Sequence, residues 1–265
     1  MCIRDSLITY MTPGFPKSLF ETIGADLDVE IEYETEASGP LPGKNPFLGD
    51  AGTELGWICS TSFVDMASTG EDPSVQLVGV AWVPDDPDAD GRPVYFGDIV
   101  TRADSDVSSF EDLRGKRVGC NDPVSLSGHY ALNFELERRE LGDDYLEKVF
   151  TGGHQSSLSA VASGDLDAAI VDSVVRTTRA RTDQSVADMR VIDRLGPWPT
   201  QPLVARISLD ANEVISLRER LLQAGKDGDL HEELQAAGLS HLVEVGPDHY
   251  QPVREAMSRL GTNGV

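Results

Sequence analysis

The sequence predicts an α/β fold with mixed, mostly parallel sheets and flanking helices. From residue 108 onward, candidate strands and helices alternate along the chain, which is typical of parallel strands joined by helices. Residues 55–59 and 168–171 are apolar runs that we interpret as buried strands. Polar clusters follow these and two other strands, and ligands of parallel sheets bind beyond the carboxyl ends of the strands.

In the first hundred residues we expect a helix near residues 17–23 and strands at 6–11, 29–34, 55–59, 76–83 and 95–101. Residues 29–34 alternate apolar with acidic side chains, so this strand has one wet face and belongs at a sheet edge. Residues 38–50 are rich in Gly and Pro and predict a loop, and the acidic stretch 84–91 predicts an exposed turn.

The second part of the chain begins with a variant capping box, Ser109 to Asp112, that opens a short helix. Residues 196–202 are rich in proline, too stiff for a helix and too polar for a core strand, and suit a connector between lobes. The remaining predicted strands are 116–118, 148–151, 168–171, 190–192, 202–207 and 242–245, and the helices are those starting near 127 and 248 and those at 155–163, 174–181, 212–224 and 231–237.

The segment 118–130 predicts a strand end, a polar turn and a helix start, with Ser127 as the N-cap. Gly128 has no Cβ that would keep a ligand from the exposed amides. These amides carry about half a positive charge from the helix dipole, and the hydroxyls of Ser125 and Ser127 add donors, so the pattern fits an oxyanion. The alternative is a serine that only caps its helix.

The composition limits the classes of partner. Forty-five acidic and 22 basic residues give a formal charge of −23, which argues against nucleic acid or anionic lipid as a partner because phosphate attraction needs surplus Lys and Arg. The three cysteines lack metal-binding spacing, and we expect no metal and no cofactor. A single bridge between Cys59 and Cys120 stays open.

No apolar run approaches the ~20 residues of a membrane span. The N-terminus also lacks a charged region followed by an apolar core, so we expect either a cytoplasmic protein or a chain without its export signal. Residues 1–6 connect poorly to the following strand and are a candidate for a non-native leader.

Several motifs together resemble the phosphonate, phosphite and phosphate-binding proteins of ABC import systems. They are Tyr95-Phe, Ser109-Phe-Glu-Asp-Leu-Arg-Gly-Lys, Asn121-Asp-Pro-x-Ser-x-Ser-Gly, Gly152-Gly-His, Ala162-Ser-Gly-Asp-Leu-Asp-Ala, Asp172-Ser and Pro202-Leu-Val-Ala-Arg. The resemblance runs from about residue 7 to residue 260 and is densest between 110 and 173. It implies the two-lobed type II periplasmic-binding-protein fold, with a hinge of two crossing segments.

The resemblance also implies a ligand-binding set and no catalytic residue. The oxyanion is expected at the helix start, on Ser125, Ser127, Gly128 and His129, with His154, Asp172 and an aromatic, Tyr95, beside it. The first lobe is expected to contribute the loop Cys59, Ser60 and Thr61, and Tyr10 is a weaker candidate. The sequence departs from the family pattern in this loop, where Ser62-Phe63 stands at the place of a frequent aromatic, so the identity of the ligand stays open.

Some of these residues have alternative roles. His129 is expected to use its backbone amide, because a cationic imidazole is disfavoured at a helix N-terminus. Asp172 either accepts a ligand proton or pairs with a ligand ammonium, or only caps the next helix. Cys59 at a strand end is more commonly an apolar filler than a reactive thiol.

The predicted lobes are residues 1–97 with 204–265, and residues 98–203, which carry the helix start. The predicted protein is a monomeric solute-binding component that captures a small phosphorus oxyanion in the cleft between its lobes and meets an ABC permease at the membrane. It would act in the periplasm or another extracytoplasmic space.

Two functions are alternatives to that of an importer component. An enzyme on the same fold could use Cys59 as nucleophile with His154 or His129 and Asp172, or resemble proteins that make thiamine precursors, but the sequence has no nucleophile elbow, metal spacing or dinucleotide loop. A sensory module that feeds a membrane receptor would have the same sequence features as the importer component.

Overall fold

The structure is a computed structural model that describes residues 6–12, 14–49, 53–68 and 73–261. The suggested leader therefore lies, except for Ser6, outside the described residues. The chain divides into two compact units. Unit 1 comprises Met1–Val94 and Pro199–Arg254, and unit 2 comprises Tyr95–Trp198 and Glu255–Val265. The lobe boundaries expected from the sequence stay a prediction.

Unit 1 is built on a five-stranded sheet with the order β2-β1-β3-β11-β4. Strand β1 pairs in parallel with β2 and β3, whereas β11 runs antiparallel to β3 and β4. The strands are β1 (Ser6–Thr9), β2 (Glu30–Tyr33), β3 (Thr53–Trp57), β4 (Val75–Leu77) and β11 (Leu203–Arg206). Strand β2 lies at the edge with Glu30 and Glu32 exposed, as its alternating sequence predicted.

A separate antiparallel pair completes the strands of unit 1, β5 (Val80–Pro84) with β12 (Leu239–Glu244). The single strand predicted at residues 76–83 is wrong, because the chain breaks between β4 and β5 at Gly79, whose φ is +90°. The break lets Trp82 of β5 stack on Trp57 of β3 at 4.4 Å between ring centroids. Both indoles are completely buried and belong to the core of unit 1.

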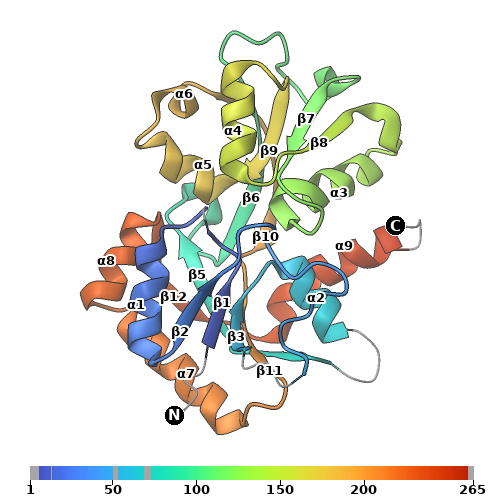
Figure 1. Cartoon of the computed structure of the whole chain (residues 1–265). Coiled ribbons are helices and arrows are strands. Elements are labelled where there is room, and N and C mark those ends of the chain that lie inside the picture. The colour runs from blue at the N-terminus through green and yellow to red at the C-terminus, as the bar shows by residue number, and fades with distance from the viewer. Residues whose placement is uncertain (1–5, 13, 50–52, 69–72, 262–265) are drawn as a thin grey trace. The chain divides into compact units, whose positions relative to one another are not determined.

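Helices α1 (Lys17–Leu27), α7 (Ala211–Ala224) and α8 (Gly228–Ala236) pack against one another in unit 1 (Figure 1). Residues 60–62, predicted as the end of a strand, instead begin helix α2 (Ser60–Ser68). Single turns of 3₁₀-helix lie at Pro87–Ala89 and Pro247–Tyr250, and α9 (Gln251–Gly261) follows the second of them.

Unit 2 holds the second five-stranded sheet, with the order β10-β6-β9-β7-β8. Strand β7 is parallel to β8 and β9, and β6 is antiparallel to β9. The strands are β6 (Val94–Thr101), β7 (Arg117–Cys120), β8 (Glu147–Phe150), β9 (Ala168–Asp172) and β10 (Arg190–Pro199). The connector expected at residues 196–202 is therefore in part a strand, since β10 runs through Pro199.

Alternate residues of the β-strands in unit 2 enter two separate cores, as period-two side-chain direction requires. Ala168 and Ile170 of β9 join the cluster under α3 (Ala131–Arg138). Ala169 and Val171 join the cluster that includes residues of α4 (His154–Ser163) and α6 (Gln184–Ala187). The sheet is thus covered on both faces, and the predicted ligand residues 125–129 and His154 lie just before α3 and at the start of α4.

A buried carboxylate ties three elements of unit 2 together. Asp98 on β6 has no exposed side-chain surface and accepts from Arg176 of α5 (Ser173–Ala180) at 2.6 Å and from Arg194 of β10 at 2.8 Å. A carboxylate buried in this way is stabilised by its charged hydrogen bonds. The contacts fix α5, and with it the preceding residue Asp172, against the sheet.

No helix within the described ranges combines the length and the apolar character that a membrane span requires.

Candidate functional site

The helix start predicted to hold an oxyanion begins two residues earlier than expected. Ser125 is the N-cap, with an extended backbone, and its Oγ accepts from the Gly128 amide at 3.1 Å. A π-helical turn, Leu126–Tyr130, leads into α3 and is closed by the Tyr130 amide on the Ser125 carbonyl at 2.9 Å. The prediction that Ser127 is the N-cap was wrong, and the Gly128 amide is already paired within the turn.

Ser127 stands one position inside this turn and has a different environment. Its side chain is buried, with 2% exposed. Among the described residues no hydrogen bond occupies its hydroxyl, whereas the Ser125 hydroxyl is used by the cap. A hydroxyl at the positive end of a helix can donate to a negative oxygen. Ser127 is therefore the better donor of the two serines.

The glycine of the motif makes room for a neighbouring side chain. A Cβ at position 128 would lie 1.9 Å from Oδ1 of Asn121 and 2.9 Å from Cε1 of His154. The approach of a ligand is the reason for Gly128 that the sequence predicts. The structure adds a second reason, because only glycine lets Asn121 and His154 pack against the helix start.

His154 is brought to this place by a glycine turn. Gly152 has a φ of +83° and Gly153 is the N-cap of α4, so His154 is the first residue of that helix. The Asp172 amide donates to its Nδ1 at 3.3 Å. Burial lowers the pKa of His154 to about 4. The imidazole is consequently neutral at pH 7, and its contribution to an anion site is a hydrogen bond.

The imidazole of His129 points to a protein carbonyl. Its Nδ1 lies 2.9 Å from the Pro123 carbonyl and its Nε2 lies 3.1 Å from Nδ2 of Asn133. Burial lowers the pKa of this histidine. The ring is occupied with holding the turn before the helix, which leaves the backbone amide as the group that His129 can offer.

Asp172 caps a helix, as one of the two alternatives predicted. Its Oδ1 accepts from the amides of Val174 and Val175 at 2.8 and 3.1 Å. It is paired with Gly97 in the sheet, two residues from Tyr95, and both Asp172 and Tyr95 are buried. A direct role of either side chain in ligand binding stays a prediction.

In unit 1 the predicted residues 59–61 surround the first turn of α2. Ser60 Oγ donates to the carbonyls of Pro199 and Thr200 at 3.2 and 3.4 Å, and Thr61 Oγ1 donates to Cys59 Sγ at 3.3 Å. The hydroxyl protons of both residues are thus used within the protein. Cys59 is buried, and it and Cys120 are free thiols, each within its own unit, so the Cys59–Cys120 bridge left open above is absent.

Tyr10 follows β1 and lines a cavity of about 390 Å³ within unit 1, together with Glu34 and Glu36. Burial, and then the negative charges of Glu34 and Glu32, raise the pKa of Tyr10 to about 12. Its phenol therefore remains a hydrogen-bond donor at every physiological pH.

Sequence reasoning missed three polar groups. The hydroxyls of Thr12 and Ser62 in unit 1 and Oδ1 of Asn121 in unit 2 are buried and have no hydrogen-bond partner. Buried polar groups are nearly always paired, so each of them is a candidate for contact with a ligand. Their position after strands was visible in the sequence, but their lack of a partner becomes apparent only in the structure.

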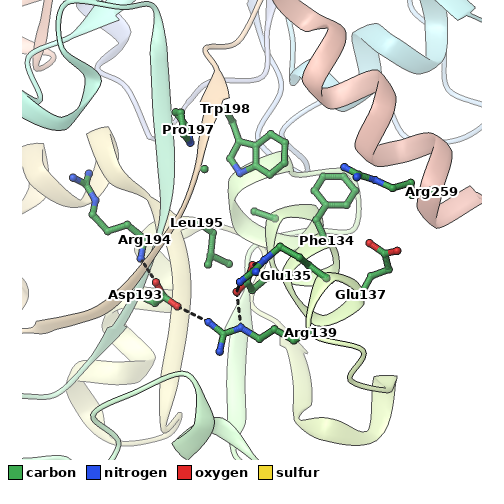
Figure 2. Close-up of a pocket in the computed structure, with 13 residues that line it drawn as sticks. Phe134, Glu135, Glu137, Arg139, Asp193, Arg194, Leu195, Pro197, Trp198 and Arg259 are labelled. Atoms are coloured by element: carbon green, nitrogen blue, oxygen red, sulfur yellow. Dashed lines mark hydrogen bonds and ion pairs between the residues drawn. The ribbon is translucent and has the colours of Figure 1, made fainter.

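A second cavity, of about 450 Å³, lies in unit 2 between α3 and β10 and is also lined by Arg259 of α9 (Figure 2). Phe134 and Trp198 form its aromatic wall, with ring centroids 5.2 Å apart. Arg139 pairs with Glu135 and Asp193 on its floor. Within the described part of the chain, no group of three or more His, Cys, Asp or Glu residues is arranged to hold a metal ion.

Solved structures with the same architecture are binding proteins. A binding-protein component of an ABC phosphonate transporter from Pseudomonas aeruginosa aligns with a TM-score of 0.77 at 16% identity, over 96% of this chain and 85% of that one. A protein from Prochlorococcus marinus in complex with methylphosphonate aligns with a TM-score of 0.76 at 15% identity, over 97% of this chain and 98% of that one. The chain thus has the fold of the type II periplasmic binding proteins, which confirms the predicted fold class.

The family assignment rests on residues 18–250, which match the periplasmic substrate-binding proteins of phosphonate ABC transporters. The chain belongs to this family. The predicted resemblance is confirmed, and so is its consequence that the family is one of substrate-binding proteins and not of enzymes.

Two relatives align over part of the chain. The phosphonates-binding periplasmic protein of Escherichia coli is 22% identical over 174 residues, 63% of this chain and 51% of the relative. A phosphate-import protein of Mycolicibacterium smegmatis is 29% identical over 150 residues, 47% of each chain. The matched region spans about half the length of both relatives.

Proposed function

We propose that this protein is the solute-binding component of an ABC importer and that it captures a small phosphorus oxyanion at the helix start of unit 2. The observation that carries the proposal is the hydroxyl of Ser127 at the positive end of the 126–138 helical segment, which has no hydrogen-bond partner among the described residues and precedes Gly128, the residue beside His154. Neutral donors and a helix dipole suit an anion in a chain whose overall charge is −23, because they attract it locally without charged partners.

The proposed ligand set keeps the residues expected from the sequence and assigns them different tasks. Ser127 donates through its hydroxyl and His129 through its backbone amide. Ser125 and Gly128 shape the turn through their mutual hydrogen bond. His154 donates through its imidazole. Tyr95, Asp172 and the unit 1 residues Tyr10, Cys59, Ser60 and Thr61 stay in the proposed set, to which we add Thr12 and Ser62.

The proposed partners are a phosphorus oxyanion and a membrane permease, and the proposed location is extracytoplasmic. One relative is a phosphonates-binding protein and the other a phosphate-import protein, and this chain is proposed to take a ligand of that class. The protein is proposed to act as a monomer, and a permease that accepts the loaded protein would separate an importer from a sensor.

A thermal-shift screen with methylphosphonate, 2-aminoethylphosphonate, phosphite and phosphate, and with sulfate as the matched control anion, tests the proposal. A ligand present at 100 times its dissociation constant stabilises the folded state by about 2.7 kcal/mol. We expect a clear rise in the unfolding temperature with at least one phosphorus oxyanion. By calorimetry, we expect Ser127→Ala to lose more than tenfold in affinity for that ligand, because a hydrogen bond to a charged group contributes about 1.5–3 kcal/mol. An unfolding temperature that does not change with any of the four phosphorus compounds, or an unchanged affinity in Ser127→Ala, contradicts the proposed function.

A further inference from the structure

We infer that Asn121, a residue outside the predicted ligand set, is a ligand-binding residue that holds one oxygen of the anion jointly with His154. The inference rests on the proposed function. It follows from the hydrogen-bonding roles that the surrounding groups force on the two side chains.

Asn121 lies where the elements of the site meet. It follows β7 directly, its backbone amide donates to the Gly128 carbonyl at 3.3 Å, and its carbonyl accepts from the Gly152 amide at 2.8 Å. Its side chain is 3% exposed. The residue therefore joins the helix start at residue 128 to the glycine turn before His154.

The tautomer of His154 is fixed by its neighbour. A backbone N–H can only donate, and the Asp172 amide points at Nδ1 of His154, so Nδ1 must be the accepting nitrogen. A neutral imidazole carries its single proton on the other nitrogen. His154 is accordingly protonated on Nε2, and Nε2 is a donor.

Nε2 of His154 faces another donor. Nδ2 of Asn121 lies 3.4 Å from it, and the same Nδ2 donates one of its two protons to Oδ2 of Asp122 at 3.0 Å. Turning the amide over would place the Asn121 oxygen against the Asp122 carboxylate, which is unfavourable. The amide is thus held with its NH₂ group beside the N–H of the imidazole, and its own Oδ1 is left buried without a partner.

A second Asn–His pair in unit 2 shows the ordinary arrangement. His129 has a carbonyl, that of Pro123, at its Nδ1, so Nδ1 carries the proton and Nε2 accepts from Nδ2 of Asn133 at 3.1 Å. There both nitrogens of the imidazole have a partner of the opposite kind. At Asn121 and His154 the partner of Nδ1 is a donor instead of an acceptor, which reverses the tautomer and leaves two donors side by side.

Two donors 3.4 Å apart converge on one acceptor. Because the two nitrogens are this close, a single oxygen can lie about 2.9 Å from both of them and accept a hydrogen bond from each. A phosphorus oxyanion supplies such an oxygen, with lone pairs for both protons. The unsatisfied contact between two donors is then the cost of holding them ready for the ligand.

Calorimetry with methylphosphonate on the full chain tests the inference, with Asn133→Ala as the matched control. Asn133 also has a buried Oδ1 without a partner and also contacts a histidine, so both variants remove the same atoms from similar surroundings. We expect Asn121→Ala to weaken binding at least tenfold and Asn133→Ala to change it less than about twofold. Equal losses in the two variants, or no loss in Asn121→Ala, would overturn the inference.

The tautomers give a test that does not depend on the folding of a variant. In nitrogen NMR spectra of the wild-type imidazoles we expect His154 to be protonated on Nε2 and His129 on Nδ1, and we expect the His154 Nε2 proton to move downfield when methylphosphonate is added. A His154 protonated on Nδ1 overturns the inference. Wild-type protein that binds none of the phosphorus oxyanions instead removes the proposed function, and the two failures are thereby distinguished.

Discussion

At the scale of single residues, the environment of His154 determines how the site treats charge. The imidazole accepts from the Asp172 amide and lies beside the NH₂ group of Asn121, and neither neighbour accepts a proton from it. Burial is the cause of its lowered pKa. Binding an anion with a neutral imidazole avoids burying a cation in the protein without a ligand to pair with it.

This environment predicts how stability depends on pH. Burial lowers the pKa of His154 from its ordinary value of 6.5 to about 4 in the folded protein, so between these pH values the unfolded chain binds a proton that the folded chain does not. The free energy of unfolding must fall as the pH falls through this window, with a contribution on the order of 3 kcal/mol. Urea unfolding of wild type and His154→Gln at pH 7, 6 and 5 measures it.

The variant is expected to lose part of the slope, since the pKa values of His129 and His249 are also lowered by burial and their contributions remain. His241→Gln is the matched control, because that side chain is exposed. Parallel pH profiles of wild type and His154→Gln would show that the environment of His154 does not lower the free energy of unfolding as the pH falls.

At the scale of elements, the helix start shows what a sequence pattern can and cannot specify. The run of serines and glycine predicted a helix start at the correct place, because serine hydroxyls favour that position. It did not identify the capping residue. The first turn is π-helical and closes from Tyr130 to Ser125, which shifts the cap from Ser127 to Ser125. Such a turn depends on what packs around it, and here Asn121 fills the space beside Gly128.

In other elements too, some features are determined by the local sequence and others depend on packing. The alternating residues of β2 act locally, and its place at a sheet edge was predicted correctly. Only residues 190–192 of β10 were predicted as a strand, because Pro197 and Pro199 argue against one. Strand β10 lies at a sheet edge, where a proline need not donate. In the site, residue types were predictable, whereas the unpaired donors depend on contacts distant in sequence, such as Asn121 with His154.

At the helix start, helix propensity and packing predict opposite effects of a Gly128 substitution on the free energy of unfolding. Replacing Gly128 by Ala should favour a helix by up to about 1 kcal/mol, but the new Cβ would lie 1.9 Å from Asn121 Oδ1. Overpacking of this kind costs typically about 1–3 kcal/mol, so we expect Gly128→Ala to lower the free energy of unfolding. Chemical denaturation measures the change.

Two further variants make this prediction specific. Gly246→Ala has open space around the new methyl group and should change stability by less than about 0.5 kcal/mol. Combining Gly128→Ala with Asn121→Ala removes the clash and should recover part of the loss, as a double-mutant cycle detects. A Gly128→Ala protein as stable as wild type would show that Asn121 moves aside at no cost.

At the scale of the whole molecule, the charge of −23 opposes both compactness and the approach of an anion. The ion pairs of unit 2 reduce this repulsion only locally, as where Arg139 meets Glu135, Glu111 and Asp193. An anion site in such a field must depend on short-range donors. The buried hydroxyl of Ser127 and the amide and imidazole N–H groups of Asn121 and His154 are donors of this kind.

The same charge predicts that added salt stabilises the protein. Raising the ionic strength from 0.01 to 0.5 M shortens the screening length from about 30 Å to well under 10 Å, which weakens repulsion among the surplus carboxylates more than it weakens the close ion pairs. We expect the unfolding temperature to rise by several degrees, since about 1 kcal/mol corresponds to roughly 2–4 °C in chains of this size class. Sodium chloride and sodium gluconate should give equal shifts at equal ionic strength if screening is the cause. A rise with chloride alone would instead identify an ion bound at a site, and a fall with both salts would show that attractive ion pairs outweigh the net repulsion.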